Sequence, residues 1–212
     1  MTRLIELDIS NPDPFIIDQA AFFIDQGSII TFPTDTLYGL VADAWNEDAL
    51  KILTQIKKRK TLKPLPCLAA DSQMAFRLAA EITECALKLS RYWPAPLTLV
   101  MKAAVNVPPT LEAGSRTIGV RVPDNLACRM LCRALNRAVV ATSANIEGED
   151  PLSTGHECAE IFEDRIIAAF EAGPLPNSLP STIVSCINEK PEVIREGAFD
   201  FAKACSGPDV NM

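Results

Sequence analysis

The sequence is poor in histidine and glycine: it contains one histidine, His156, and nine glycines among 212 residues. A metal site built from several histidines is therefore excluded, and a Ser-His-Asp or Cys-His mechanism would have to use His156. Its segment reads STGHECAEIF, in which Thr154 and Glu157 are spaced as a capping box, so we interpret His156 as part of a helix start. Neither GxGxxG nor GxxxxGK[ST] occurs. A bound nucleotide would have to be held by side chains.

Long hydrophobic runs and an excess of positive charge are also missing. The longest apolar runs, such as AAFFI and PLTLVM, are shorter than the roughly 18 to 20 residues that span a bilayer. The N-terminus lacks the apolar core of a signal peptide. A net charge of -7 and a pI of about 4.8 argue against broad, sequence-independent binding to nucleic acid. We expect a cytoplasmic protein with no membrane partner and at most weak binding to tRNA.

Paired cysteine motifs are lacking as well. The seven cysteines are scattered and form no CxxC pair, which favours neither a disulfide framework nor a zinc site. Most are interpreted as small buried hydrophobic residues, and no tightly bound protein metal is expected. Cys128 and Cys132 are four residues apart, so we expect them on one face of a helix.

What the sequence does contain is an alternation of helical periods and short β-branched runs, the pattern of a mixed α/β domain. Helices are expected at residues 14–26, after Asn46, after Asp71, at 83–92, at 126–136 and after Thr154. About seven strands are expected, among them 28–32, 65–70, 97–103, 117–122 and 138–144. No repeat or linker divides the chain, so we predict one domain over residues 1–212, with a core at about 15–200 and a loose tail at 201–212.

The stretch QIKKRKTLKPL, residues 55–65, holds five of the 20 basic residues of an acidic chain. Cations at a helix C-terminus are favoured by its dipole, and a solvated helix end explains one or two of these charges. Five charges next to the apolar run PLPCLAA repel one another unless an anion lies among them. Lys57, Arg59 and Lys63 are therefore candidate phosphate ligands. A solvated helix end, a nucleic-acid patch and a localisation signal are the alternatives.

Polar motifs flank several of the expected strands. PTDTLYG follows SIITF, TSAN follows AVVA, PST precedes IVSCI, and arginines lie in VRVP and VIREG. Loops at strand ends are where α/β sheets place ligands, and hydroxyl and guanidinium groups suit carboxylates and phosphates. Each motif alone is explained by local turn hydrogen bonds. Together they predict a polar cleft.

Seven motifs resemble, in order, those of the YrdC-like threonylcarbamoyl-AMP synthases of the short, single-domain type: FPTDTLYGL, KKR with KPL, WPAPLTLV, TIGVRVP, ATSAN, PSTIV and IREGA. The resemblance implies a mixed α/β domain with a twisted, mixed parallel and antiparallel sheet, flanked by helices, around a positively charged cleft. It implies a nucleotidyltransferase that joins L-threonine, bicarbonate or CO2, and ATP into threonylcarbamoyl-AMP and pyrophosphate. The product serves threonylcarbamoyladenosine (t6A) modification of tRNA. Mg2+ with ATP, and separate tRNA threonylcarbamoyl transferase proteins, belong to the same implication.

The resemblance also assigns roles to the matching positions. Those implied for threonine binding are Thr36, Arg121, Ala141 and Ser181. Those implied for ATP binding are Arg59, Lys63, Thr117, Ser143, Asn145 and Arg195. Lys57 and Arg59 would be catalytic, because they would neutralise the charge that builds on the phosphate while the site holds two anions together. Such a mechanism requires no histidine.

Three positions depart from the family pattern. Leu68 stands where many members have a histidine near the threonine, Pro151 where they have a serine, and Ala95 where they have a glycine. A divergent paralogue with another substrate is therefore one alternative. The others are a double-stranded RNA or nucleotide-binding protein, a carbamoyl-transfer domain like that of hydrogenase-maturation carbamoyltransferases, and a regulatory protein on an inactive synthase scaffold. The low pI argues against the first of these, and intact KxR, SAN and REG elements argue against the last.

Overall fold

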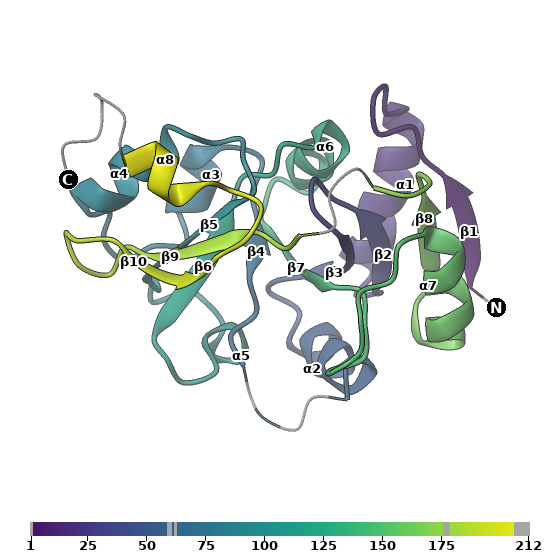
Figure 1. The fold of residues 1–212 in the computed structure, drawn as a ribbon. Helices are drawn as coiled ribbons and strands as arrows, with labels where there is room; N and C mark the ends of the chain where they lie inside the picture. The colour runs from purple at the N-terminus through teal and green to yellow at the C-terminus, as the bar shows by residue number, and fades with distance from the viewer. Residues whose placement is uncertain (1, 59–60, 62, 176–178, 206–212) are drawn as a thin grey trace.

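The computed structural model describes residues 2–58, 61, 63–175 and 179–205. Ten strands of this part of the chain form one sheet in the order β1-β8-β2-β3-β7-β4-β6-β5-β9-β10 (Figure 1). The strands are β1 (Arg3–Glu6), β2 (Ile30–Pro33), β3 (Tyr38–Asp43), β4 (Cys67–Leu68), β5 (Leu97–Lys102), β6 (Thr117–Arg121), β7 (Val139–Ser143), β8 (Ala168–Glu171), β9 (Thr182–Ser185) and β10 (Glu192–Arg195).

Helices cover both faces of this sheet. Figure 1 shows α1, α6, α3 and α4 along one side and α2 and α5 along the other. The helices are α1 (Pro14–Asp25), α2 (Glu47–Ile56), α3 (Ser72–Phe76), α4 (Glu84–Ser90), α5 (Pro109–Glu112), α6 (Leu126–Ala134), α7 (Gly155–Phe162) and α8 (Phe201–Cys205), with a 3-10 turn η1 (Glu163–Arg165). The predicted fold class, a mixed α/β domain with a mixed sheet flanked by helices, is confirmed.

Six of the helices begin where a short polar side chain accepts a hydrogen bond from a backbone N–H of the first turn. The Asn46 side chain accepts from the backbone N–H of Ala49 at 3.0 Å, and the same kind of cap starts five more helices. The other caps are Asp13, Asp71, Thr83, Asn125 and Thr154. Because such capping is local chemistry, the helix starts expected after Asn46, Asp71 and Thr154 are confirmed.

The middle of the sheet joins strands that are distant in sequence. Strand β4 pairs in parallel with β6 and antiparallel with β7, which places Leu68 between Arg121 and Val139. Strand β7 pairs with β3 so that Ser143 lies opposite Gly39. The polar motifs at the ends of these strands are thereby brought to one region of the sheet.

Two strands, β1 and β3, were not predicted. The tail expected to be loose from residue 201 onward is helical at residues 201–205. Strand β3 (YGLVAD) is buried at every position and so shows no alternation of polar and apolar residues, whereas β1 is a four-residue edge strand with mostly exposed side chains. In the tail, residues 201–205 form α8, and the carbonyl oxygen of its buried Ala204 accepts a hydrogen bond from the Tyr92 hydroxyl at 2.9 Å. Residues 206–212 lie outside the described part.

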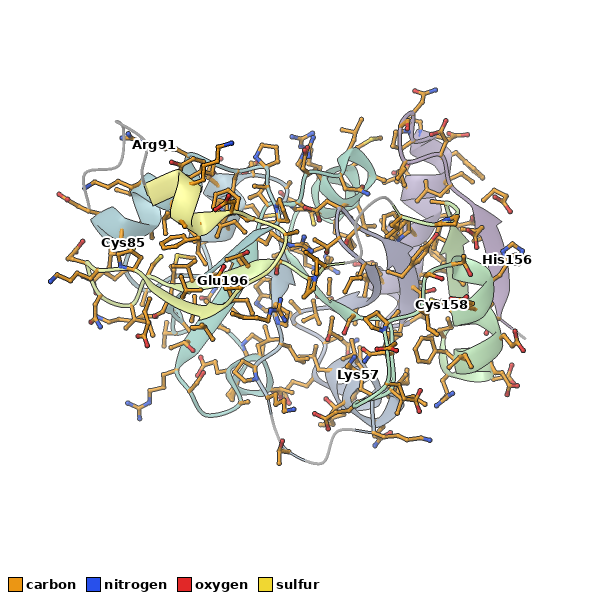
Figure 2. All side chains as sticks on the ribbon, viewed as in Figure 1. Lys57, Cys85, Arg91, His156, Cys158 and Glu196 are labelled. Atoms are coloured by element: carbon orange, nitrogen blue, oxygen red, sulfur yellow. The ribbon has the colours of Figure 1, made fainter. Side chains whose placement is uncertain are left out.

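Among the described residues, the cysteines and the histidine form no cluster that could hold a metal ion. The six cysteines whose side chains are described are free and buried, and Cys128 and Cys132 both lie on the buried face of α6, as predicted. His156 lies in the first turn of α7 (Figure 2). Its Nδ1 is 2.8 Å from the carboxylate of Glu171. Among the described residues, no helix is long and apolar enough to cross a membrane.

Candidate functional site

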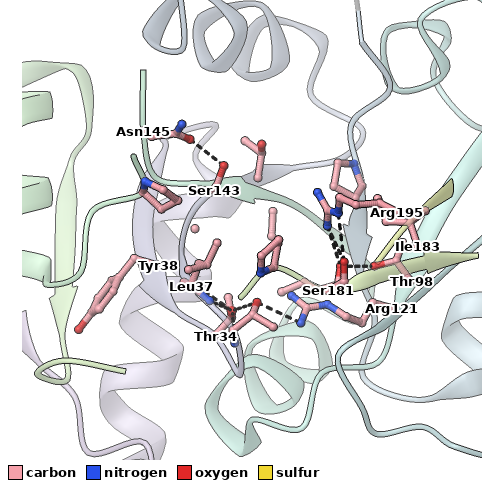
Figure 3. Close-up of a pocket in the computed structure, with 18 of the residues that line it drawn as sticks. Thr34, Leu37, Tyr38, Thr98, Arg121, Ser143, Asn145, Ser181, Ile183 and Arg195 are labelled. Carbon is pink, nitrogen blue, oxygen red and sulfur yellow. Dashed lines mark hydrogen bonds between the residues drawn. The ribbon is translucent and has the colours of Figure 1, made fainter. Parts of the chain in front are cut away.

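A cleft with a volume of about 590 Å3 opens in the middle of the sheet, at the ends of the central strands and beside the segment that follows α2 (Figure 3). This size is within the range typical of small-molecule sites. The described residues that line it are Thr34, Thr36, Leu37, Tyr38, Gly39, Lys57, Lys63, Pro64, Pro66, Cys67, Leu68, Thr98, Arg121, Ala141, Thr142, Ser143, Asn145, Glu147, Gly148, Pro151, Pro180, Ser181, Ile183 and Arg195.

Nine of the eleven residues proposed from the sequence line this cleft. They are Thr36, Lys57, Lys63, Arg121, Ala141, Ser143, Asn145, Ser181 and Arg195. Arg59 lies outside the described residues. Thr117 lies at the start of β6, where its hydroxyl is 2.8 Å from that of Ser115, and it is not part of the lining. It faces the same side of the sheet as Arg121 but is four residues away, roughly 13 Å along a strand.

One end of the cleft is built around the buried guanidinium of Arg121. This group donates to the carboxylate of Asp35 and, at 3.3 Å, to the hydroxyl of Thr36. The second carboxylate oxygen of Asp35 accepts from the backbone N–H of Asp124 at 3.1 Å. Asp35 therefore fixes the orientation of Arg121, a role that the sequence analysis missed although Asp35 lies within the PTDT motif.

A second guanidinium, that of Arg195, lies at the same end. It donates to the carbonyl oxygen of Ser181 from Nε at 3.2 Å and from Nη2 at 2.7 Å, and the Ser181 hydroxyl lies 2.8 Å from that of Thr98. Burial and the nearby positive charge of Arg121 lower the pKa of Arg195. Figure 3 shows Arg121 and Arg195 on either side of Ser181. Two neighbouring cations with hydroxyl groups between them suit a carboxylate or a phosphate.

Gly197 holds the Arg195 segment close to Ser181. A Cβ atom at this position would lie 2.3 Å from the carbonyl oxygen of Pro180 and 2.5 Å from the carbonyl carbon of Ser181. No side chain fits there without displacing backbone, so the glycine of the REG motif is required by close packing against the cleft wall.

Lys57 follows α2 and is almost completely buried, with 4 % of its surface exposed. Its ammonium group donates to the carbonyl oxygen of Ser143 at 2.6 Å and to the carbonyl and side-chain oxygens of Asn145 at 3.1 and 2.8 Å. The loop after β7 is therefore tied to the end of α2. This makes Lys57 a positioning group for the loop, which the sequence did not indicate.

The same loop carries an acidic residue into the cleft. Glu147 forms an ion pair with Lys63, and its backbone N–H donates to the carbonyl oxygen of Lys57 at 2.9 Å. The sequence analysis missed Glu147, because nothing in the spacing of the chain links it to a lysine more than eighty residues earlier. Its position two residues after the TSAN motif was the only available signal.

The three departures from the family pattern occupy different places. Leu68 and Pro151 line the cleft, and Leu68 is buried beside Arg121 in the parallel pairing of β4 with β6. Ala95 is buried outside the lining, and its backbone N–H donates to the carbonyl oxygen of Val122 at 3.0 Å. Only the first two are placed to touch a ligand.

The described residues include no set of side chains that could hold a metal ion without a ligand. No group of three or more His, Cys, Asp or Glu side chains among them could hold a metal ion. The described cleft lining contains four cationic side chains and one carboxylate, that of Glu147. The site is therefore suited to anions.

Fold and site together define an α/β protein with a cation-lined cleft in the middle of an open mixed sheet. The sequence model of the Sua5, YciO and YrdC family, described as "Telomere recombination", matches residues 23–197. The chain belongs to this family.

Three relatives illustrate the similarity. The threonylcarbamoyl-AMP synthase of Pyrococcus abyssi is 35 % identical over 181 residues, which cover 85 % of this chain and 53 % of the relative. That of Bacillus subtilis is 32 % identical over 205 residues, covering 95 % and 59 %. The structure of P. abyssi Sua5 complexed with L-threonine superposes with a TM-score of 0.91 at 32 % identity, covering 96 % of this chain and 60 % of Sua5. The chain thus spans little more than half the length of these relatives.

Proposed function

We propose that the protein is an L-threonylcarbamoyladenylate synthase, which forms threonylcarbamoyl-AMP and pyrophosphate from L-threonine, bicarbonate or CO2, and ATP. The observation that supports the proposal is that one cleft, in a chain of this family, has a set of anion-binding side chains at each of its two ends. Arg121, Thr36 and Ser181 gather at one end. Lys63, Ser143 and Asn145 belong to the other end, beside the loop after β7.

At the first end, the guanidinium of Arg121 would bind the carboxylate of threonine. Asp35 holds that guanidinium, and the hydroxyl of Thr36 lies 3.3 Å from it. The backbone of Ala141 on β7 would contact the amino acid from the adjacent strand. A carboxylate bound in this way keeps the threonine amine at a defined distance from the nucleotide end, which is the main requirement of the reaction.

The reaction then needs two bond-forming steps. The threonine amine attacks the carbon of CO2 and loses a proton, or attacks bicarbonate with loss of water, to give a carbamate. A carbamate oxygen then attacks the α-phosphate of ATP as the bond to pyrophosphate breaks. Negative charge grows on the phosphates in the second step, and cationic side chains fixed beforehand stabilise it. Lys57 and Arg59 are the residues proposed for this task, with Lys63 and Arg195 as further contacts to ATP. Thr117, at the start of β6, lies outside the described lining, so a contact with the nucleotide has no support from its position.

Divalent metal would enter with the nucleotide. The carboxylate of Glu147 lies in the described lining beside Lys63, and such an oxygen is the kind of ligand Mg2+ takes alongside substrate phosphates. When bound, Mg2+ would supply positive charge to the departing pyrophosphate. The protein residues would bind and orient the two substrates and limit access of water.

The test is ATP-dependent release of pyrophosphate, measured with and without L-threonine and bicarbonate. We expect release to require all three substrates and to yield threonylcarbamoyl-AMP by mass spectrometry. Replacement of Lys102, which pairs with Glu81 on the surface, by alanine should leave the rate unchanged. Pyrophosphate release that is independent of any amino acid would contradict the proposal.

A second candidate is synthesis of the same type of adenylate from another amino acid. It is favoured by Leu68, whose apolar side chain lines the cleft beside Arg121 where many family members have a histidine. Serine, valine and other amino acids should therefore be compared with threonine in the same assay. Leu68→His should shift the preference toward threonine if this leucine selects the substrate.

The proposed product, threonylcarbamoyl-AMP, requires a second enzyme that uses it. Threonylcarbamoyl-AMP is an activated donor, so a transferase that modifies adenosine in tRNA must consume it. We place both steps in the cytoplasm, with the tRNA threonylcarbamoyl transferase proteins as the partners that receive the product.

A further inference from the structure

Glu147 is the one carboxylate in the described lining of the cleft, and it lies at the end assigned to the nucleotide. Its side chain is 25 % exposed and forms an ion pair with Lys63, which is 56 % exposed. The region therefore presents a negative group where the proposed substrate brings a polyphosphate. An acidic side chain at a phosphate site is unfavourable unless something compensates its charge.

The position of Glu147 is fixed by its backbone. Its N–H donates to the carbonyl oxygen of Lys57 at 2.9 Å, and the N–H of Glu149 donates to the carbonyl oxygen of Ile146 at 3.0 Å. The side chain of Asn145, two residues earlier, donates from Nδ2 to the carbonyl oxygen of Glu149 at 2.7 Å. These bonds close the loop on itself and on α2, so the carboxylate stays near the phosphates when Lys63 turns toward the ligand.

The two described lysines that line the cleft are already directed at protein oxygens. The ammonium of Lys57 donates to Ser143 and Asn145, and that of Lys63 to Glu147. A triphosphate without metal would compete with Glu147 for Lys63 and be repelled by the carboxylate. A triphosphate carrying a divalent cation would release Lys63 to the phosphates and offer the carboxylate a new cationic partner.

We infer that Glu147 makes the cleft select the magnesium complex of the nucleotide over the free nucleotide. The inference rests on the proposed function and adds to it the form of the nucleotide that binds and the residue that discriminates. The carboxylate acts through charge: it disfavours binding of the free triphosphate and would favour a triphosphate that carries a divalent cation.

The test is the affinity for ATP, measured by titration calorimetry in excess Mg2+ and in EDTA, for the wild-type protein and for Glu147→Gln. We expect the wild type to bind ATP at least about tenfold more tightly with Mg2+ than without it. In Glu147→Gln the affinity in EDTA should rise about five- to tenfold while the affinity in Mg2+ does not rise, so that the preference nearly disappears.

Glu149→Gln is the matched control, because it makes the same charge change on the same loop at an exposed side chain outside the lining. It should keep the wild-type preference for Mg2+. An equal gain of affinity in both buffers would reduce Glu147 to a simple competitor for Lys63 and overturn the inference, as would no change in either buffer. Failure of the wild type to bind ATP at all would instead overturn the proposed function.

Discussion

The ammonium group of Lys57 holds Asn145 twice, through the backbone carbonyl oxygen at 3.1 Å and the side-chain oxygen at 2.8 Å. These residues are 88 positions apart in the chain, and the contact joins the end of α2 to the loop that follows β7. Lys57 therefore holds the loop after β7 in place at the nucleotide end of the cleft. This role is separate from any charge that its ammonium group offers to a ligand.

Lys57→Met should destabilise the fold as well as weaken nucleotide binding. The substitution leaves three acceptor oxygens without this donor, so we expect a loss of about 2–4 kcal/mol in the free energy of unfolding by urea. Lys102→Met at an exposed ion pair should change it by less than about 1 kcal/mol. An unchanged free energy of unfolding in Lys57→Met would mean that the lysine serves the ligand alone.

Asp35→Asn should weaken amino-acid binding without touching the ligand directly. Loss of the carboxylate frees the guanidinium of Arg121 from a fixed orientation, and we expect the affinity for L-threonine to fall about tenfold or more. The measurement is calorimetric titration with L-threonine. Asp124→Asn is the control, because Asp124 has an exposed side chain of the same charge that pairs with Arg129. Equal effects of both substitutions would remove the positioning role of Asp35.

Arg59→Ala should abolish pyrophosphate release and leave the fold intact. Arg59 lies outside the described residues, so this prediction rests on the KxR motif and on charge: a triphosphate requires fixed cations as its α-phosphate is attacked. Circular dichroism and thermal unfolding would check the fold. Arg91→Ala, at the exposed end of α4, is the control. Near-normal turnover in Arg59→Ala would reject the assignment.

Glu171 should make the free energy of unfolding depend on pH in the acidic range. Burial opposes ionisation of its carboxylate, but hydrogen bonds from the backbone N–H groups of His156 and Gly173 and from the His156 ring outweigh it and lower the pKa. A lowered pKa in the folded state means that the stabilisation is present above the ordinary value near 4.5 and is lost as the pH falls through the folded value.

Glu171→Gln should therefore cost about 2 kcal/mol in the free energy of unfolding at pH 7, and the difference from wild type should shrink as the pH falls below about 4.5. Urea unfolding at several pH values measures it. His156→Gln, which retains both backbone donors, should give a smaller loss. A difference that stays constant down to acidic pH would show that the charge of Glu171 is not what stabilises the fold.

The sequence predicted those features that local chemistry determines. Asn46 and Asp71 begin helices because their side chains accept hydrogen bonds from N–H groups of the turn that follows. The motifs at strand ends line one cleft because the ends of neighbouring strands lie together at one edge of the sheet. Arg121, Ser181 and Arg195 were thus placed correctly in one cleft, although they come from three strands or their flanking residues.

Features that depend on distant partners were not predictable in this way. Five basic residues between positions 55 and 65 look alike in sequence, and only folding shows that Lys57 turns inward to Asn145 while Lys63 meets Glu147. Strand β3 was not predicted, because it is buried at every position and its residues show no alternation of polar and apolar side chains. The residues that determine the roles of Lys57 and Lys63 are more than eighty positions away in the sequence.

The pairing of β9 with β5 has a consequence for biosynthesis. Strand β9 covers the edge of β5 by pairing Thr182 with Leu97 and Val184 with Leu99, and the residues beside it supply Ser181 and Arg195. A nascent chain that ends before β9 leaves the apolar edge of β5 unpaired. It also lacks Arg195, so Arg121 would be the only guanidinium left in the described lining of its cleft. Ligand cannot rescue such a fragment, because stabilisation by mass action requires the finished cleft. Truncated products should therefore aggregate or be degraded even when substrate is abundant.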